Sequence, residues 1–357
     1  MIKVLHAADF HLDAAFSALP PELAVRRRAE QRMVLERLAQ EAQACDIVLL
    51  AGDLFDSARI YRDSLEALRR FFEACDAEIF IAAGNHDYLT PGSPYLTEDW
   101  GERVHIFRTA SIECVHLDHL HCDVYGASFT APEMPALLDG FHVSNPDVTN
   151  LMVLHGDVLN PASPYHPIAP EAVSASGLDY LALGHIHKVE IHKFGATVCA
   201  WPGCLMGRGF DECGQKGALL AEIASSGCRV HFLPVASRRY EILSVEAGDD
   251  PLAAVRSALP DNTRDDCYRI ILTGEAETFD TAALEAALAP EFFSLSVRDN
   301  TYPKQSLWDV CGEDTLRGHF LENLKVQYDA ADETQRRILA QAAKLGLALL
   351  DGREVLV

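Results

Sequence analysis

The sequence has little basic charge: it contains 30 lysines and arginines against 53 aspartates and glutamates, for a formal net charge of −23. A protein that holds nucleic acid unaided normally presents a basic surface, because phosphate neutralisation supplies most of the non-specific affinity. For a nucleic-acid substrate, metals or a partner would therefore have to supply the attraction. We expect the arginines of the local basic run VRRRAEQR (residues 25–32) to lie on a solvated helix face.

Long apolar runs are also absent, since no stretch approaches the ~20 residues that a membrane-spanning helix requires. The ten cysteines include no CxxC pair, which argues against a structural thiolate zinc site. A predicted strand that ends in a candidate metal ligand, Asp9, opens the sequence and leaves no room for a signal peptide. We therefore expect a cytoplasmic protein with reduced thiols and no membrane insertion.

Five apolar runs within the first 190 residues end in carboxylate, amide or imidazole side chains. Runs of this kind, closed by Gly or a polar cluster, predict buried strands, and an open α/β sheet places its chemistry beyond the carboxyl ends of its strands. The side chains at these ends are Asp9, His11, Asp53, Asp56, Asn85, His86, Asp87, His155, His185 and His187. We expect them to converge in space although the sequence separates them widely.

The length of 357 residues predicts more than one compact unit, because single cores stop growing near ~250 to 300 residues. Strands alternate with helical patterns over residues 1–235, which predicts an α/β catalytic domain of mixed sheets flanked by helices. Residues 236–303 are expected to form a small α+β capping domain. Residues 304–357 are expected to be helical, with apolar stripes that either engage a partner or pack against this chain.

The residue types at the strand ends are typical of a catalytic metal site. Mixed nitrogen and oxygen donors without thiolate favour manganese, iron or zinc. Two such ions ~3.5 to 4 Å apart can bind a phosphoryl oxygen and generate hydroxide near neutral pH. Asp53 is the best candidate to bridge them, since each carboxylate oxygen can bind one ion. If Asp9 and Asp53 are the only anionic ligands, the ions leave an excess of two positive charges, which would attract a phosphodiester.

The motifs DFH, GDLFD, GNHD, a strand-terminal His155 and GHIH, in this order, resemble those of the calcineurin-like metallophosphoesterase superfamily. That resemblance implies a sandwich of mixed β-sheets flanked by helices. Within the superfamily, the chain resembles the SbcD/YhaO-like DNA repair exonucleases. This narrower resemblance is carried by DFHLDAAF (9–16), GDLFD (52–56), WPGCLMGRGFDECGQKGALLAEI (201–223), FLENLK (320–325) and LGLALLDGREV (345–355).

The resemblance also implies roles for individual residues. One metal would be bound by Asp9, His11 and His187, and the other by Asn85, His155 and His185, with Asp53 bridging them. His86 would stabilise the transition state or protonate the leaving oxygen, and Asp56 would orient and charge its imidazole. Some relatives carry a second histidine where Asp56 stands. Arg208 is either a phosphate contact or a turn residue without a ligand.

The function implied is that of a two-metal DNA phosphodiesterase, the exonuclease subunit of a repair complex. Manganese is the expected metal, with iron and zinc as alternatives. The expected partners are DNA, a second copy of the chain in a homodimer, and an SbcC-like coiled-coil ATPase. Two other functions stay open. The metals could serve a phosphatase or phosphodiesterase for nucleotides or other small phosphate esters, or the chain could be a non-catalytic scaffold of a repair assembly.

Overall fold

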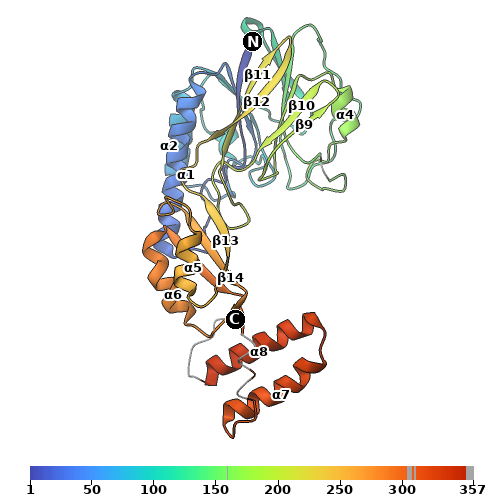
Figure 1. Cartoon of the computed structure of the whole chain (residues 1–357). Helices are drawn as coiled ribbons and strands as arrows, with labels where there is room; N and C mark the ends of the chain where they lie inside the picture. Colours follow the sequence, from blue (N-terminus) through green and yellow to red (C-terminus); the bar gives the residue numbers. More distant parts are fainter. Residues whose placement is uncertain (159, 304–307, 309–310, 351–357) are drawn as a thin grey trace. The chain divides into compact units, whose positions relative to one another are not determined.

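The computed structural model describes residues 1–158, 160–303, 308 and 311–350, and it divides the chain into two compact units, Met1–Ser237 and Arg238–Val357 (Figure 1). The second unit contains what is described of the expected C-terminal helical segment and of the expected capping domain, except for residues 236 and 237, which lie in the first unit. The end of that segment, 351–357, with the last letters of LGLALLDGREV, lies outside the described residues. No helix in the described ranges combines the length and apolarity needed to cross a bilayer.

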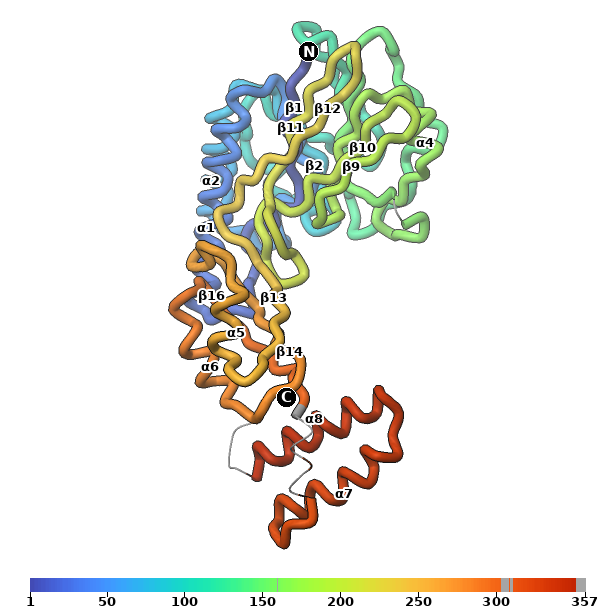
Figure 2. The backbone as a smooth tube through the Cα atoms, in the orientation of Figure 1, coloured from blue at the N-terminus to red at the C-terminus, as the bar shows by residue number. Residues whose placement is uncertain are grey.

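The first unit contains two six-stranded mixed sheets. The first sheet has the order β12-β11-β1-β2-β3-β4, in which β1 to β4 are parallel and β11 and β12 are antiparallel to their neighbours. Figure 2 shows β1, β11 and β12 side by side, although β1 lies at the start of the sequence. The bounds are β1 (Ile2–Ala7), β2 (Ile47–Ala51), β3 (Glu78–Ala82), β4 (Val104–Ile106), β11 (Gly217–Ala224) and β12 (Gly227–Pro234).

The second sheet has the order β5-β6-β7-β8-β10-β9, with β6, β7, β8 and β10 parallel and an antiparallel strand at each edge. Its bounds are β5 (Glu113–Leu117), β6 (Cys122–Gly126), β7 (Thr149–His155), β8 (Tyr180–Gly184), β9 (Val189–Phe194) and β10 (Thr197–Pro202). The helices of this unit are α1 (Pro21–Ala42), α2 (Arg62–Glu73), α3 (Pro94–Thr97), η1 (Asp118–Leu120) and α4 (Pro170–Ala175).

Three apolar layers account for the all-apolar strand sequences. Leu49 of the first sheet and Val153 of the second belong to a shared core between the sheets. The opposite face of the first sheet packs against α1 and α2 through residues such as Leu50 and Leu38, and Leu154 on the far face of the second sheet joins a third core. Strands buried on both faces need apolar residues at successive positions, as β2 (IVLLA) shows. The structure confirms the predicted α/β class of mixed sheets flanked by helices.

The second unit contains a parallel sheet of order β13-β14-β16 joined by crossover helices, and a helical pair, α7 and α8. The pair packs through Leu321 and Leu347, and the ammonium of the buried Lys344 contacts Asp299, the last residue of β16, and Thr301. The bounds are β13 (Tyr240–Glu246), α5 (Pro251–Ala258), β14 (Cys267–Thr273), β15 (Glu275–Ala276), α6 (Thr281–Leu288), η2 (Ala289–Glu291), β16 (Ser294–Asp299), β17 (Tyr302–Pro303), α7 (Leu316–Ala330) and α8 (Glu333–Leu350).

Candidate metal centre

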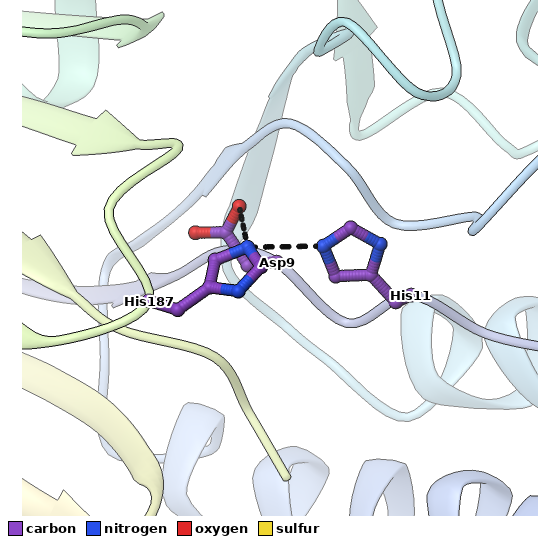
Figure 3. Close-up of side chains that lie close together, drawn as sticks. All are labelled: Asp9, His11 and His187. Carbon is purple, nitrogen blue, oxygen red and sulfur yellow. Dashed lines mark hydrogen bonds and ion pairs between the residues drawn. The ribbon is translucent and has the colours of Figure 1, made fainter. Parts of the chain in front are cut away.

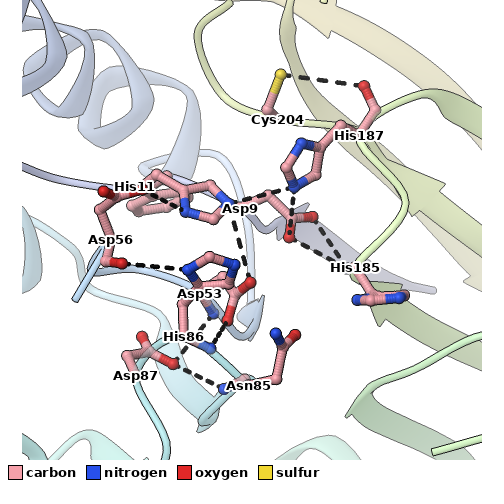
Figure 4. A network of polar contacts seen from close by, with 12 residues as sticks. Asp9, His11, Asp53, Asp56, Asn85, His86, Asp87, His185, His187 and Cys204 are labelled. Carbon is pink, nitrogen blue, oxygen red and sulfur yellow. Dashed lines mark hydrogen bonds and ion pairs between the residues drawn. The ribbon is translucent and has the colours of Figure 1, made fainter. Parts of the chain in front are cut away.

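The predicted ligands lie where five strands end, at the carboxyl edges of β1, β2 and β3 in one sheet and of β7 and β8 in the other (Figure 4). Parallel strands deliver the side chains that follow them to one edge of the sheet. The residues there are Asp9 and His11 after β1, Asp53 and Asp56 after β2, Asn85, His86 and Asp87 after β3, His155 at the end of β7, and His185 and His187 after β8.

The backbone at this edge has an uncommon conformation. Four of the residues have a positive φ: Asp9 (52°), His11 (44°), Asp53 (52°) and His185 (93°). Non-glycine residues seldom adopt this region, and such strain clusters at functional sites. The N–H groups of Asp9 and His11 donate to the carbonyls of Gly52 and Asp53 at 3.0 and 2.9 Å. The loops after β1 and β2 are therefore tied together.

The glycine that opens each of three motifs makes room for a predicted ligand. A Cβ on Gly84 would lie 2.1 Å from Asp53 Oδ1, and one on Gly184 would lie 2.8 Å from His155 Nδ1. Gly52, with a φ of 85°, approaches the same ring nitrogen, and its added Cβ would lie at 2.5 Å. Since real Cβ atoms do not approach this closely, GDLFD, GNHD and GHIH need glycine where the loops pack on one another.

Asp9, His11 and His187 form one group of candidate ligands (Figure 3). The Nε2 atoms of His11 and His187 face each other at 3.2 Å, and His187 Nε2 lies 3.6 Å from Asp9 Oδ1. Burial disfavours the charged imidazole, yet the hydrogen bonds to Asp9 and Glu212 raise the pKa of His187 to about 10. Binding of a metal at His187 Nε2 therefore requires the loss of a proton.

Asp9, Asp53 and His155 form a second group. His155 Nε2 lies 3.4 Å from Asp53 Oδ2 and 2.9 Å from Asn85 Oδ1. His155 Nδ1 donates to the Ala51 carbonyl at 2.8 Å, so a neutral ring would turn the lone pair of Nε2 toward the oxygen of Asn85. A cation coordinated by both atoms would relieve this contact between two acceptors. The donor set thus fits a divalent ion.

A third group consists of His11, Asp53 and His86. In each of the three groups, the candidate ligand atoms lie within 4.8 Å of one another. Asp9, His11 and Asp53 each belong to two groups, and all three side chains are almost completely buried. The two carboxylates, Asp9 and Asp53, are thus each shared between two groups, and the bridging role of Asp53 stays a prediction.

His185 lies beside the three groups but belongs to none of them. Its N–H donates to the Asp9 carboxylate at 3.1 and 3.2 Å, and its ring packs 5.3 Å from that of His155 and 5.0 Å from that of Tyr165. Burial, followed by the neighbouring His155, lowers the pKa of His185 to about 4. The ring is therefore neutral at pH 7, as a metal ligand must be. Its ligand role stays a prediction.

His86 is the exposed member of the third group. Its N–H donates to Asp53 Oδ1 at 2.9 Å, and its ring Nδ1 lies 3.1 Å from the main-chain carbonyl of Asp56. The Asp56 carboxylate instead lies 3.1 Å from His11 Nδ1 and accepts from Arg208 at 3.1 Å. The expectation that this carboxylate orients His86 is therefore wrong, because the chain after β2 turns its carbonyl, and not its side chain, toward that ring.

Asp87 supports the loop that carries Asp53. Its buried carboxylate accepts hydrogen bonds from the main-chain N–H groups of Asp53, Leu54, Phe55 and Gly84 and from the Tyr95 hydroxyl. Burial and the nearby Asp53 raise the pKa of Asp87, and the donors oppose that rise. This side chain joins the ends of β2 and β3, so it positions ligands without being one of the predicted set.

Glu212 is a buried residue that the sequence analysis missed. Its carboxylate lies 2.8 Å from His187 Nδ1 and accepts from the Arg208 main-chain N–H at 2.7 Å and from the Arg208 guanidinium at 2.7 Å. Burial raises the pKa of a carboxyl, but the hydrogen bonds from His187 and Arg208 hold the pKa of Glu212 well below its usual range. The only sequence signal was its position four residues after Arg208.

Two residues of α1 were also missed as site supports. Arg27 lies within VRRRAEQR, but it is buried and donates to the Gly207 carbonyl at 2.8 Å, so the expectation of a solvated face is wrong for this arginine. Gln31, one helical turn later, donates to the His11 carbonyl at 2.8 Å. Their spacing of four residues, which places both on one helix face, was the available signal.

Comparisons with known proteins place the chain in a family. The family model described as calcineurin-like phosphoesterase matches residues 2–189, a span that contains the seven predicted ligands. The uncharacterized metallophosphoesterase YhaO of Bacillus subtilis is 28% identical over 340 residues, covering 87% of this chain and 80% of that protein. The DNA double-strand break repair protein Mre11 of Aeropyrum pernix is 27% identical over 271 residues (70% and 64%). The D component of the nuclease SbcCD of Bacillus subtilis is 23% identical over 275 residues (63% and 67%).

Proposed function

We propose that this chain, which belongs to the calcineurin-like phosphoesterase family, is a metal-dependent phosphodiesterase that cleaves DNA. The observation that carries the proposal is the sharing of the buried carboxylates Asp9 and Asp53 among three groups of candidate ligands, because a carboxylate has two oxygens and can bind two neighbouring ions. The choice of DNA is supported by two relatives, one named a DNA double-strand break repair protein and the other a nuclease.

The chemistry divides between the ions and the chain. Two bound divalent ions, which we propose to be manganese, would supply a hydroxide nucleophile near neutral pH and bear charge on the non-bridging phosphoryl oxygens. Asp9 and Asp53 are the only carboxylates in the three groups, so the loaded site would keep a positive charge that attracts a phosphodiester. His86 is exposed and fixed by its main-chain hydrogen bond to Asp53, so its ring can donate a proton to the leaving oxygen.

The proposed partners are DNA, a second copy of this chain and an SbcC-like coiled-coil ATPase. One relative is named as part of a nuclease complex, which supports assembly with another protein. The α7–α8 pair leaves Leu316, Val326, Ile338 and Leu349 exposed, and an amphipathic helix of a partner could cover such side chains. A partner that carries basic charge would also offset the net charge of −23 when DNA binds.

The test is a manganese-supplemented assay on three substrates: linear duplex DNA, bis-p-nitrophenyl phosphate and a cyclic nucleotide. We expect DNA cleavage by the wild type and its loss in His86→Ala with metal content retained. Cleavage of the small esters alone, with the partner ATPase present, would favour a small-ester phosphodiesterase. An unchanged background rate in His86→Ala would indicate a non-catalytic scaffold.

A further inference from the structure

We propose that Glu212 and Arg208 form a brace that positions the imidazole rings of His187 and His11. These are the two histidines of the first group of candidate ligands, which we call the first metal position. The proposal rests on the metal function put forward above. Its basis is a continuous series of contacts from His187 through Glu212, Arg208 and Asp56 to His11. Neither Glu212 nor Arg208 belongs to the three ligand groups, so both would act through the histidines.

Glu212 sets the orientation of His187. Its Oε1 lies 2.8 Å from His187 Nδ1, closer than the Arg208 Nη2 atom at 3.2 Å. Because a carboxylate can only accept a hydrogen bond, the shorter contact assigns the proton to Nδ1. The other ring nitrogen, Nε2, then faces Asp9 and His11. A ligand histidine needs this division of roles, because the hydrogen bond made by one nitrogen fixes the tautomer and aims the lone pair of the other.

The Asp56 carboxylate lies at ion-pair distance from His11, 3.1 Å from its Nδ1, without the alignment of a hydrogen bond. The two carboxylates are joined by one guanidinium. Arg208 donates from Nη1 to Asp56 at 3.1 Å and from Nη2 and Nε to Glu212 at 2.7 and 3.2 Å. All three nitrogens of Arg208 therefore contact carboxylates, and a planar fork of this kind holds its acceptors in fixed directions. We accordingly assign Arg208 to bracing, whereas the sequence left open a phosphate contact or a turn residue without a ligand.

The loop that carries the brace is anchored at both ends. The carbonyl of Gly207 accepts from buried Arg27 of α1 at 2.8 Å. Lys216, which is also buried, donates to the main-chain carbonyl of His187 at 3.2 Å. The main-chain carbonyl of Lys216 also accepts from the N–H groups of Val235 and Ala236. Because the main chain is held on either side of Glu212, the fold and not only its own hydrogen bonds keeps the carboxylate at His187.

The experiment compares Mn²⁺ binding by the full-length wild type, Glu212→Gln and Asp211→Asn. Asp211 is exposed and adjacent, so its amide removes the same charge from the same loop without touching a histidine. We expect the wild type to bind two ions, Glu212→Gln to bind the ion at the first position about 10- to 100-fold more weakly, and Asp211→Asn to match the wild type. Equal binding by Glu212→Gln would overturn the brace and leave the proposed function standing. A wild type that binds no metal would overturn both.

A second measurement on the wild type removes the dependence on a variant that folds. Long-range ¹H–¹⁵N correlation spectra of the zinc-loaded protein report which nitrogen of each histidine ring carries the proton. We expect His187 to carry it on Nδ1 and to bind metal through Nε2. A proton on Nε2 would overturn the assignment of Glu212, because its carboxylate could not then accept from Nδ1.

Discussion

Asp87→Asn should destabilise the catalytic unit and disturb metal binding together, although the two side chains have the same shape. The carboxylate accepts from Asp53 and Gly84 on Oδ1, and from Leu54, Phe55 and the Tyr95 hydroxyl on Oδ2. An amide nitrogen placed at either oxygen position meets donors only. The less damaging orientation places it at Oδ1 and loses two main-chain hydrogen bonds.

The magnitude follows from those two bonds. Hydrogen bonds to charged groups contribute about 1.5–3 kcal/mol each, and part of this is recovered because a buried carboxylate is no longer desolvated. We expect a loss of about 3–5 kcal/mol in the free energy of unfolding, measured by urea denaturation, together with weaker Mn²⁺ binding. The binding effect arises because the displaced main chain includes the N–H of Asp53.

The control is Asp123→Asn, which changes another buried aspartate, one that is remote from the candidate ligands and contacts His116. We expect a loss of about 1 kcal/mol for this variant and no change in metal binding. If Asp87→Asn costs less than about 1 kcal/mol and binds Mn²⁺ as the wild type does, then Asp87 does not support the bridging ligand and the reasoning fails.

Three further outcomes are expected. Gly84→Ala would place a Cβ 2.1 Å from Asp53 Oδ1 and should weaken Mn²⁺ binding at least about tenfold. Its control is Gly92→Ala, whose Cβ would meet nothing within 4 Å and which should bind Mn²⁺ as the wild type does. Equal affinities of the two variants for Mn²⁺ would contradict the packing argument. Arg27→Met breaks a buried set of polar contacts and should lower the free energy of unfolding by about 3 kcal/mol, measured by urea denaturation. Arg26→Met, at an exposed position, should lower it by under about 0.5 kcal/mol. Similar losses in the two variants would show that Arg27 does not support the site. Manganese at 100 times its Kd should add about 2.7 kcal/mol to the free energy of unfolding and raise Tm, and EDTA should reverse both changes. A Tm that does not change with metal would argue against a metal site in the folded state.

The sequence predicted the parts of the site that depend on regular structure. Apolar runs such as IVLLA can be satisfied only in strands buried on both faces, and the polar residues that follow parallel strands must then gather at one edge. Asp9, Asp53 and His155 meet for this reason, and the glycine in front of each polar cluster marks where two loops pack closely. These features are local in sequence, so one chain was enough to find them.

The contacts that failed depend on the path of loops, which periodicity does not encode. Asp56 lies three residues after Asp53, and whether its carbonyl or its carboxylate meets His86 is decided by main-chain direction alone. Glu212 reaches His187 across two segments that no repeat or spacing relates. Residue type suggested a role for Asp56 but could not say which histidine it would contact, and it gave no indication that Glu212 would reach the site.

The supports of the centre come from outside the motifs that supply its ligands. A strand end fixes where a side chain begins, but ligand geometry also requires that each ring be turned correctly and each loop be held. Here α1 holds the loops through Arg27 and Gln31, and the loop after β10 turns a ring through Glu212. Substitutions at these positions should therefore weaken metal binding while every predicted ligand stays intact, and a chain with all its motifs could still lack activity.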